Sequence, residues 1–250
     1  PGVLKPNKTV NIPDINLNFP SLTEKDRNDI MNGIALGFDF VSLSFIRNRK
    51  DVEVVREVIG ESNIQLIAKI ENNEGVQNFD EILAVADGIM IARGDLGIEI
   101  PYEKVPILQK QMIYKCRAAG KPVIVATQML ESMRESIIPT RAEVSHVANA
   151  VIDATHAIML SAETSTGKYP SQAVMTMQKI ASEAESVLRQ SPMHEHTSAS
   201  LEVDELCRNL CDISANMELR GIIVISNTGN TIRSLIRHRP NIQVWEVANT

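Results

Sequence analysis

The chain is 250 residues long, with 44% hydrophobic residues and a formal net charge of -6 at pH 7. That length can bury the core of one large α/β domain or slightly more. The acidic balance argues against nucleic acid or an anionic membrane as the main partner, because both attract basic surfaces. The apolar runs are too short to cross a bilayer and the first residues do not resemble a signal peptide, so we expect a cytoplasmic protein.

The cysteines do not form a pattern that is typical of a disulfide scaffold or a metal site. Cys116, Cys207 and Cys211 are odd in number and lack Cys-x-x-Cys spacing. We therefore expect packed free thiols, as in a reducing compartment.

Two helix-start signals punctuate the first two thirds of the chain. Residues 1–13 are rich in proline and are predicted to be a connector. Ser21-Leu22-Thr23-Glu24 has the form of a capping box and predicts a helix that Gly37 ends. Thr140-Arg141-Ala142-Glu143 is a second capping box, at the start of a later helix.

Between and after these signals, apolar runs alternate with segments of helical periodicity. The expected strands are 40–45, 65–70, 88–92, 123–127 and 157–160. The expected helices are 49–59, 74–84, 105–119, one from 140 and 171–188, with a loop between 92 and 105. Strands that alternate with helices indicate a parallel sheet, and repeated units without a GxGxxG turn favour a TIM (β/α)8 barrel.

In such a barrel the functional groups lie at the carboxyl ends of the strands. Those ends carry far more polar side chains than the strand starts. They are Ser44, Arg47, Lys69, Glu71, Arg93, Asp95, Thr127, Gln128, Ser161 and Glu163.

The pattern changes near residue 190. We assign residues 14–190 to the barrel portion, 191–200 to a linker and 201–250 to the start of a second α/β domain. The second domain is expected to contain a helix 201–217, a strand 221–225, a helix that ends at 237 and a strand 243–247.

One cluster of charged residues is the best candidate for a catalytic site. Side chains alternate along a strand, so Lys69 and Glu71 share one face. Glu71 and Asp95, at neighbouring strand ends beside Lys69, are suited to hold Mg²⁺ against an anionic substrate. A lysine near a glutamate at a strand end is, taken alone, more often a plain ion pair.

Several motifs together make the hypothesis specific. In chain order they are Lys69-Ile70-Glu71-Asn72, Ala92-Arg93-Gly94-Asp95-Leu96-Gly97, Ala126-Thr127-Gln128-Met129-Leu130-Glu131-Ser132-Met133, Pro139-Thr140-Arg141-Ala142-Glu143 and Met159-Leu160-Ser161-Ala162-Glu163-Thr164. With these motifs the chain resembles the pyruvate kinase family from about Lys8 to its last residue. The resemblance implies a partial (β/α)8 barrel, from its fourth to its eighth strand, followed by the first part of the C-terminal α/β domain.

The resemblance also implies an activity. The family transfers a phosphoryl group from phosphoenolpyruvate to ADP in glycolysis, giving pyruvate and ATP. Glu71 and Asp95 would hold Mg²⁺ or Mn²⁺, and Lys69 would face the transferred phosphoryl group and the enolate oxygen. Arg93 and the backbone N–H groups of Gly94 and Asp95 would bind substrate.

Further positions match the family's site. Thr127 would bind substrate and help to deliver a proton to the enolate, through water. Lys8 would approach the nucleotide phosphates, Ser44 would lie near a K⁺ site, and Ser161 and Glu163 would support the site from behind.

The C-terminal portion contains a candidate effector loop. It consists of Ser226, Asn227, Thr228, Gly229, Asn230 and Thr231. These groups are suited to bind phosphate, as the matching loop does for a sugar phosphate in some members of the family, or to form a plain helix-capping turn.

Some features depart from the family. Ala154 and His146 stand where the family often has Gly and Asp, and we expect packing effects there. The family's first three barrel strands and its lid have no counterpart here, so we expect the 250 residues alone to be inactive. We also expect a homo-oligomer, because the family is usually tetrameric.

Two alternatives stay open on the residues. One is a Mg²⁺-dependent lyase or aldolase that acts on a pyruvate enolate, since such barrels use similar carboxylate pairs. The other is a non-catalytic truncated scaffold.

Overall fold

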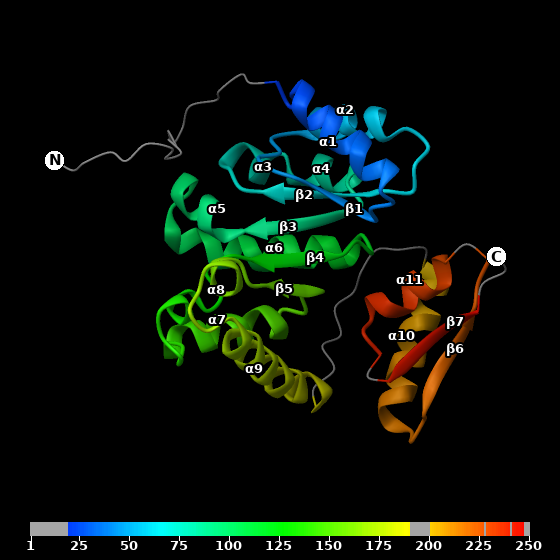
Figure 1. The fold of residues 1–250 in the computed structure, drawn as a ribbon. Coiled ribbons are helices and arrows are strands. Elements are labelled where there is room, and N and C mark those ends of the chain that lie inside the picture. The colour runs from blue at the N-terminus through cyan, green and yellow to red at the C-terminus, as the bar shows by residue number, and fades with distance from the viewer. Residues whose placement is uncertain (1–19, 191–200, 228, 241, 248–250) are drawn as a thin grey trace. The chain divides into compact units, whose positions relative to one another are not determined.

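The structure is a computed structural model that describes residues 20–190, 201–227, 229–240 and 242–247. The chain divides into two compact units, which meet in the sequence between Gln109 and Lys110. Figure 1 shows the elements of both units along the chain. The predicted connector 1–13, which includes Lys8, and the predicted linker 191–200 lie outside the described residues.

Three parallel strands form the sheet of the first unit. They are β1 (Phe40–Leu43), β2 (Gln65–Ile70) and β3 (Gly88–Ala92). Leu43 of β1 pairs with Ala68, and Ile70 of β2 pairs with Ile91. All five residues of β3 are buried, as expected for a parallel strand that is covered on both faces. The parallel sheet predicted from the sequence is confirmed.

Helices cover one side of these strands (Figure 1). They are α1 (Glu24–Ala35), α2 (Arg49–Ile59), α3 (Asn73–Gln77) and α4 (Phe79–Val85). Val52, Val55 and Ile59 are buried along one face of α2, at the spacing that an amphipathic helix requires. After β3 come α5 (Arg93–Glu99), the short η1 (Tyr102–Lys104) and α6 (Val105–Ala118), which contains the boundary between the units.

Two expectations about element ends are wrong in this unit. The first helix is capped by Thr23, whose side chain accepts from the Asp26 N–H, and not by Ser21. The Ser21 hydroxyl donates instead to Asp51, because a partly buried carboxylate is the stronger acceptor. The first strand ends at Leu43 and not at residue 45, because Phe45 has φ 54° and cannot continue a strand.

Two further differences concern helices. The predicted helix 74–84 is two helices that meet at Asn78, whose side-chain amide donates to the Arg47 carbonyl at 2.9 Å. This side-chain bond competes with a continuous helix. The segment after β3, expected to be a loop, starts a helix at Arg93.

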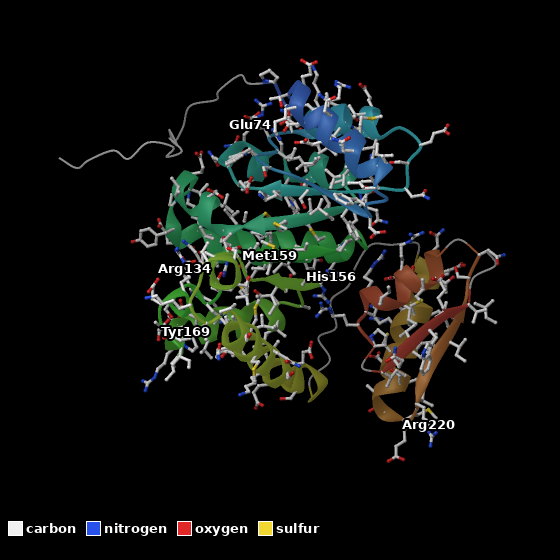
Figure 2. The ribbon with its side chains drawn as sticks, in the orientation of Figure 1. Glu74, Arg134, His156, Met159, Tyr169 and Arg220 are labelled. Atoms are coloured by element: carbon white, nitrogen blue, oxygen red, sulfur yellow. The ribbon has the colours of Figure 1, made fainter. Side chains whose placement is uncertain are left out.

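The second unit begins with a further parallel pair. In it, β4 (Val123–Ala126) pairs with β5 (Ala157–Met159), and Ala126 lies beside Met159. The helical elements are η2 (Glu131–Arg134), α7 (Arg141–Ile152), α8 (Ala162–Ser165) and α9 (Pro170–Gln190). The capping box at Thr140 and Glu143 is confirmed. Figure 2 labels Met159, the last residue of β5, and Arg134, the last residue of η2.

The last elements also follow the prediction. They are α10 (Leu201–Asn216), β6 (Gly221–Ile225), α11 (Asn230–Arg237) and β7 (Gln243–Val247). The strands β6 and β7 are parallel, and Cys207, Val224 and Leu235 form a small core between sheet and helices. A crossover helix is the usual connection between neighbouring parallel strands, and the predicted second domain 201–250 stays a prediction.

The three cysteines are free thiols, as predicted. Burial raises the pKa of the Cys116 thiol to about 12, so it is unreactive at neutral pH. Within the described ranges, no helix is both long and apolar enough to span a membrane.

Ala154 has a strained backbone. It follows α7 with φ 63° and is 6% exposed, and an L-residue in the left-handed region costs about 1–2 kcal/mol. We expect Ala154→Gly to raise the free energy of unfolding by about 0.5–1 kcal/mol, because glycine removes that strain but has more entropy to lose on folding. Urea denaturation of the intact polypeptide measures this.

Ala150→Gly is the matched control, because Ala150 is fully buried inside α7. There glycine is expected to destabilise by about 1 kcal/mol. A destabilising Ala154→Gly would show that the methyl group's packing outweighs the backbone strain.

Candidate active site

An ion pair lies at the carboxyl end of β2. Lys69 Nζ is 2.8 Å from Glu71 Oε1, and the side chains are 23% and 2% exposed. The pair forms because alternate residues of a strand project to the same side. Lys69 and Glu71 are therefore brought together as the sequence predicts.

The neighbouring strand adds a hydroxyl and a backbone donor to this pair. Because Leu43 pairs with Ala68, Ser44 comes level with Lys69, and Lys69 Nζ donates to Ser44 Oγ at 2.9 Å. The next residue, Phe45, donates its backbone N–H to Glu71 Oε2 at 2.7 Å. Both oxygens of the buried Glu71 carboxylate thus accept a hydrogen bond, which fixes its orientation and partly compensates its charge.

The loop that carries Ser44 and Phe45 is anchored on its far side by Asp51, which is 4% exposed. Arg47 donates to Asp51 from its backbone N–H at 2.9 Å and from Nε and Nη2 at 3.0 Å. Burial alone would raise the pKa of Asp51, but the hydrogen bonds from Arg47 and Ser21 outweigh it and lower the pKa. Neither Phe45 nor Asp51 was singled out by the motifs, because their contacts are made by backbone groups or across loops.

We expect Asp51→Asn to lower the free energy of unfolding by about 2 kcal/mol at pH 7, because charge-assisted hydrogen bonds to Arg47 are lost. The pKa of Asp51 is lower in the folded state, so its carboxylate stabilises above the unfolded pKa of about 4. The difference between wild type and variant should therefore shrink as the pH falls through the lowered folded pKa. Denaturant titrations between about pH 3 and 7 measure it.

The control is Asp29→Asn, which removes an exposed ion pair with Lys25 on α1. It should cost much less than Asp51→Asn, because solvent screens an exposed pair. An equal loss in the two variants would mean that burial adds nothing to the Asp51 contacts.

The end of β3 supplies the other predicted residues of the first unit. Because Ile70 pairs with Ile91, Glu71 comes level with Ala92, and α5 starts at the next residue. Asp95 lies in the first turn of α5. Mg²⁺ in phosphate-transfer sites takes one or two carboxylates from the protein and its other ligands from substrate and water, so a metal site shared by Glu71 and Asp95 stays a prediction. Across the described residues, no three Asp, Glu, His or Cys side chains gather as a self-sufficient metal cage.

Arg93 lies in the interior. Its side chain is 8% exposed, and its Nη1 donates to Gln109 Oε1 at 3.4 Å. Burial lowers the pKa of its guanidinium to about 10, so it still carries its charge at pH 7. The predicted contact of Arg93 with substrate stays a prediction.

Thr127, Ser161 and Glu163 belong to the second unit. Thr127 follows β4 with φ 67°, and its hydroxyl donates to the Ala126 carbonyl at 2.6 Å. Glu163 is fully buried and accepts backbone N–H groups from Ser161 at 2.8 Å and from Leu130 at 3.1 Å. The structure therefore brings Ser161 and Glu163 together beside the loop of Thr127, and the proximity of Thr127 to Lys69 stays a prediction.

The candidate effector loop has the geometry of a turn before a helix. Gly229 has φ 72° and donates its N–H to Ser226 Oγ at 2.9 Å, and α11 starts at Asn230. Thr228 lies outside the described residues. A phosphate site here stays a prediction.

Parallel strands alternating with helices, with an ion pair and further carboxylates at their carboxyl ends, define the class as a portion of a (β/α)-barrel enzyme. The chain matches the family model described as pyruvate kinase, barrel domain, over residues 1–174. It belongs to the pyruvate kinase family.

Similar proteins agree. The chain is 47% identical over 252 residues to a pyruvate kinase of Bacillus licheniformis, covering 98% of this chain and 43% of that protein. It is 46% identical over 255 residues to one of Clostridium acetobutylicum, covering 98% and 53%. A solved pyruvate kinase of Cryptosporidium parvum superposes with a TM-score of 0.87 at 41% identity, covering 96% of this chain and 52% of that one. The chain thus spans about half the length of the relatives it matches.

Proposed function

We propose that the intact polypeptide containing these residues is a pyruvate kinase, which transfers the phosphoryl group of phosphoenolpyruvate to ADP. The observation that carries this is the Lys69–Glu71 pair, at 2.8 Å, at the carboxyl end of β2. Membership of the family supports phosphoryl transfer over the lyase or aldolase alternative. The proposed place of the reaction is glycolysis in the cytoplasm, and free thiols fit that reducing compartment.

Lys69 has the central role in the proposed reaction. Phosphoryl transfer proceeds through a loose transition state, so the protein mainly positions the groups and neutralises charge. The Lys69 ammonium is held between Ser44 and Glu71, and from there it would meet the phosphoryl group and the enolate oxygen. Charge on that oxygen appears only as the bond breaks, so a cation there lowers the barrier as well as binding substrate.

The metal sites follow from the same groups. Glu71 and Asp95 would hold Mg²⁺ or Mn²⁺, because each oxygen of Glu71 keeps a lone pair besides the one that accepts its hydrogen bond. When bound, the metal neutralises charge on the phosphoryl group and the enolate. Ser44 would stand near a K⁺ site, and Gly94 and Asp95 would offer backbone N–H groups to the substrate carboxylate.

The remaining roles rest on the family likeness. Thr127 would help to deliver a proton to the enolate carbon through water, since a threonine hydroxyl is too weak an acid alone. Lys8 would bind nucleotide phosphate, and a homo-oligomer is the proposed assembly.

The test is an assay of the intact polypeptide with phosphoenolpyruvate, ADP, Mg²⁺ and K⁺. Equal amounts of pyruvate and ATP are expected, with no pyruvate when ADP is omitted. Cleavage of a carbon–carbon bond without nucleotide would overturn the proposal in favour of a lyase. No product under any condition would leave the scaffold alternative.

A further inference from the structure

The loop after β4 holds two consecutive residues in a costly backbone conformation. Thr127 and Gln128 have φ values of 67° and 52°. Left-handed backbone costs an L-residue about 1–2 kcal/mol, and a β-branched residue such as threonine is rarely found there. Such strain persists where the surrounding structure over-determines the backbone, and it clusters at functional sites.

Apolar anchors fix the loop on the side that follows the strained pair. Met129, Leu130 and Met133 are fully buried. Apolar packing is non-directional, however, so it holds the loop down without setting the peptide orientations.

A buried carboxylate sets the orientation of the peptide groups in this loop through directional hydrogen bonds. Glu163 Oε1 accepts the Leu130 N–H at 3.1 Å, and Oε2 accepts the Ser161 N–H at 2.8 Å. The two donors belong to loops that leave β4 and β5 at the same level, because Ala126 pairs with Met159. One carboxylate therefore bridges the ends of two adjacent strands. Glu163 has no exposed surface, so loss of either bond would leave charge and N–H groups buried without compensation.

The backbone of Glu163 is fixed as well. A Cβ atom at Gly167 would clash with the Glu163 carbonyl oxygen and come within 3.2 Å of the Arg134 Cα. The Lys168 N–H also donates to the Arg134 carbonyl at 2.8 Å. The turn that carries Glu163 is therefore packed tightly against η2. Because of this packing, the Glu163 carboxylate cannot easily shift if the Thr127 loop moves.

We propose that Glu163 is a positioning residue, which directs the Thr127 hydroxyl by holding the left-handed turn Thr127–Gln128 through Leu130. This inference rests on the proposed function for the role of Thr127, and it gives Glu163 a specific task beyond general support of the site. A small shift of Glu163 should therefore displace the Thr127 hydroxyl and slow proton delivery, since misplacement of a reacting group by about 1 Å can cost about 10²-fold in rate.

The experiment is a double-mutant cycle in the intact polypeptide with Glu163→Gln and Thr127→Ala. The glutamine amide keeps one acceptor and turns an NH₂ group toward the other N–H. We expect Glu163→Gln to lower kcat by about 10²-fold with a KM for phosphoenolpyruvate within about threefold. In the Thr127→Ala background it should lower kcat by less than about threefold, because residues that act as a unit are not additive.

The matched control is Glu143→Gln, in the same unit. Glu143 accepts the backbone N–H groups of Ser132 in η2 at 2.7 Å and of Thr140 at 2.8 Å, whereas Glu163 accepts that of Leu130, next to the Thr127–Gln128 turn. The midpoint temperature of thermal unfolding should fall in both glutamine variants, but kcat should change in Glu163→Gln alone. If Glu163→Gln does not fold, Glu163→Asp, which keeps the charge on a shorter side chain, takes its place in the cycle.

Amide hydrogen exchange separates the possible results. Faster exchange at Leu130 with unchanged kcat would overturn the proposal, as would effects of Glu163 and Thr127 that multiply independently. If wild type makes no pyruvate, the proposed function fails. Exchange at Leu130 that stays slow in the Glu163 variant would overturn the positioning role even then.

Discussion

Replacing Lys69 by methionine in the intact polypeptide is expected to lower kcat by about 10³-fold, the upper range for losing one preorganised electrostatic group. The ammonium lies 2.8 Å from Glu71 and 2.9 Å from Ser44. These two contacts hold its charge in one position, which another cation would have to reproduce in order to replace it. Its charge matters most where the enolate develops, so KM should change far less than kcat. Steady-state kinetics of pyruvate formation give both constants.

The control is Lys25→Met, which makes the same chemical change at an exposed pair with Asp29 on α1. It should leave kcat within about twofold, because exposed pairs contribute little even to stability. A circular dichroism spectrum and melting curve establish that Lys69→Met is folded. A folded Lys69→Met enzyme with kcat within tenfold of wild type would show that the ammonium is only part of a structural ion pair.

The second large effect is expected from Glu71→Gln. The change keeps the shape and one carbonyl oxygen for the Phe45 N–H, but removes the negative charge that a divalent cation needs. We expect the dissociation constant for Mn²⁺ to rise by at least about 10²-fold, since even changes behind a metal's direct ligands cost 10–100-fold. Mn²⁺ binding followed by electron paramagnetic resonance measures this without turnover.

Glu53→Gln is the matched control, because Glu53 pairs with Arg49 on the exposed surface of α2. Its Mn²⁺ dissociation constant should equal that of wild type within error. An unchanged dissociation constant in Glu71→Gln would remove Glu71 from the metal site and with it the proposed arrangement of the substrate. Reduced activity without reduced metal binding would assign Glu71 to orienting Lys69.

The parts of the site that follow from strand geometry could be predicted from the sequence. Lys69 and Glu71 meet because they are two residues apart on a strand, and Ser44 reaches Lys69 because parallel strands end at the same edge. The capping box at Thr140 was also predictable, because its hydrogen bonds join residues only three apart in the sequence.

The parts that depend on distant partners could not be predicted. Ser21 looked like a cap, but Asp51, thirty residues away, takes its hydroxyl and leaves the cap to Thr23. Thr127 and Gln128 are not glycines, so nothing local indicates their positive φ values, which depend on contacts such as that of Leu130 with Glu163, 33 residues away. Asn78 divides a helix for a similar reason, because its amide binds the Arg47 carbonyl.

The bond between Phe45 and Glu71 has a consequence for sequence variation. The contact uses the main chain, while the Phe45 ring is half exposed. A saturation library at position 45 should therefore accept side chains of almost any size, with glycine and asparagine enriched because they adopt φ 54° most readily. Proline alone lacks the donor and has its φ locked near -65°, so it should be depleted from every active clone.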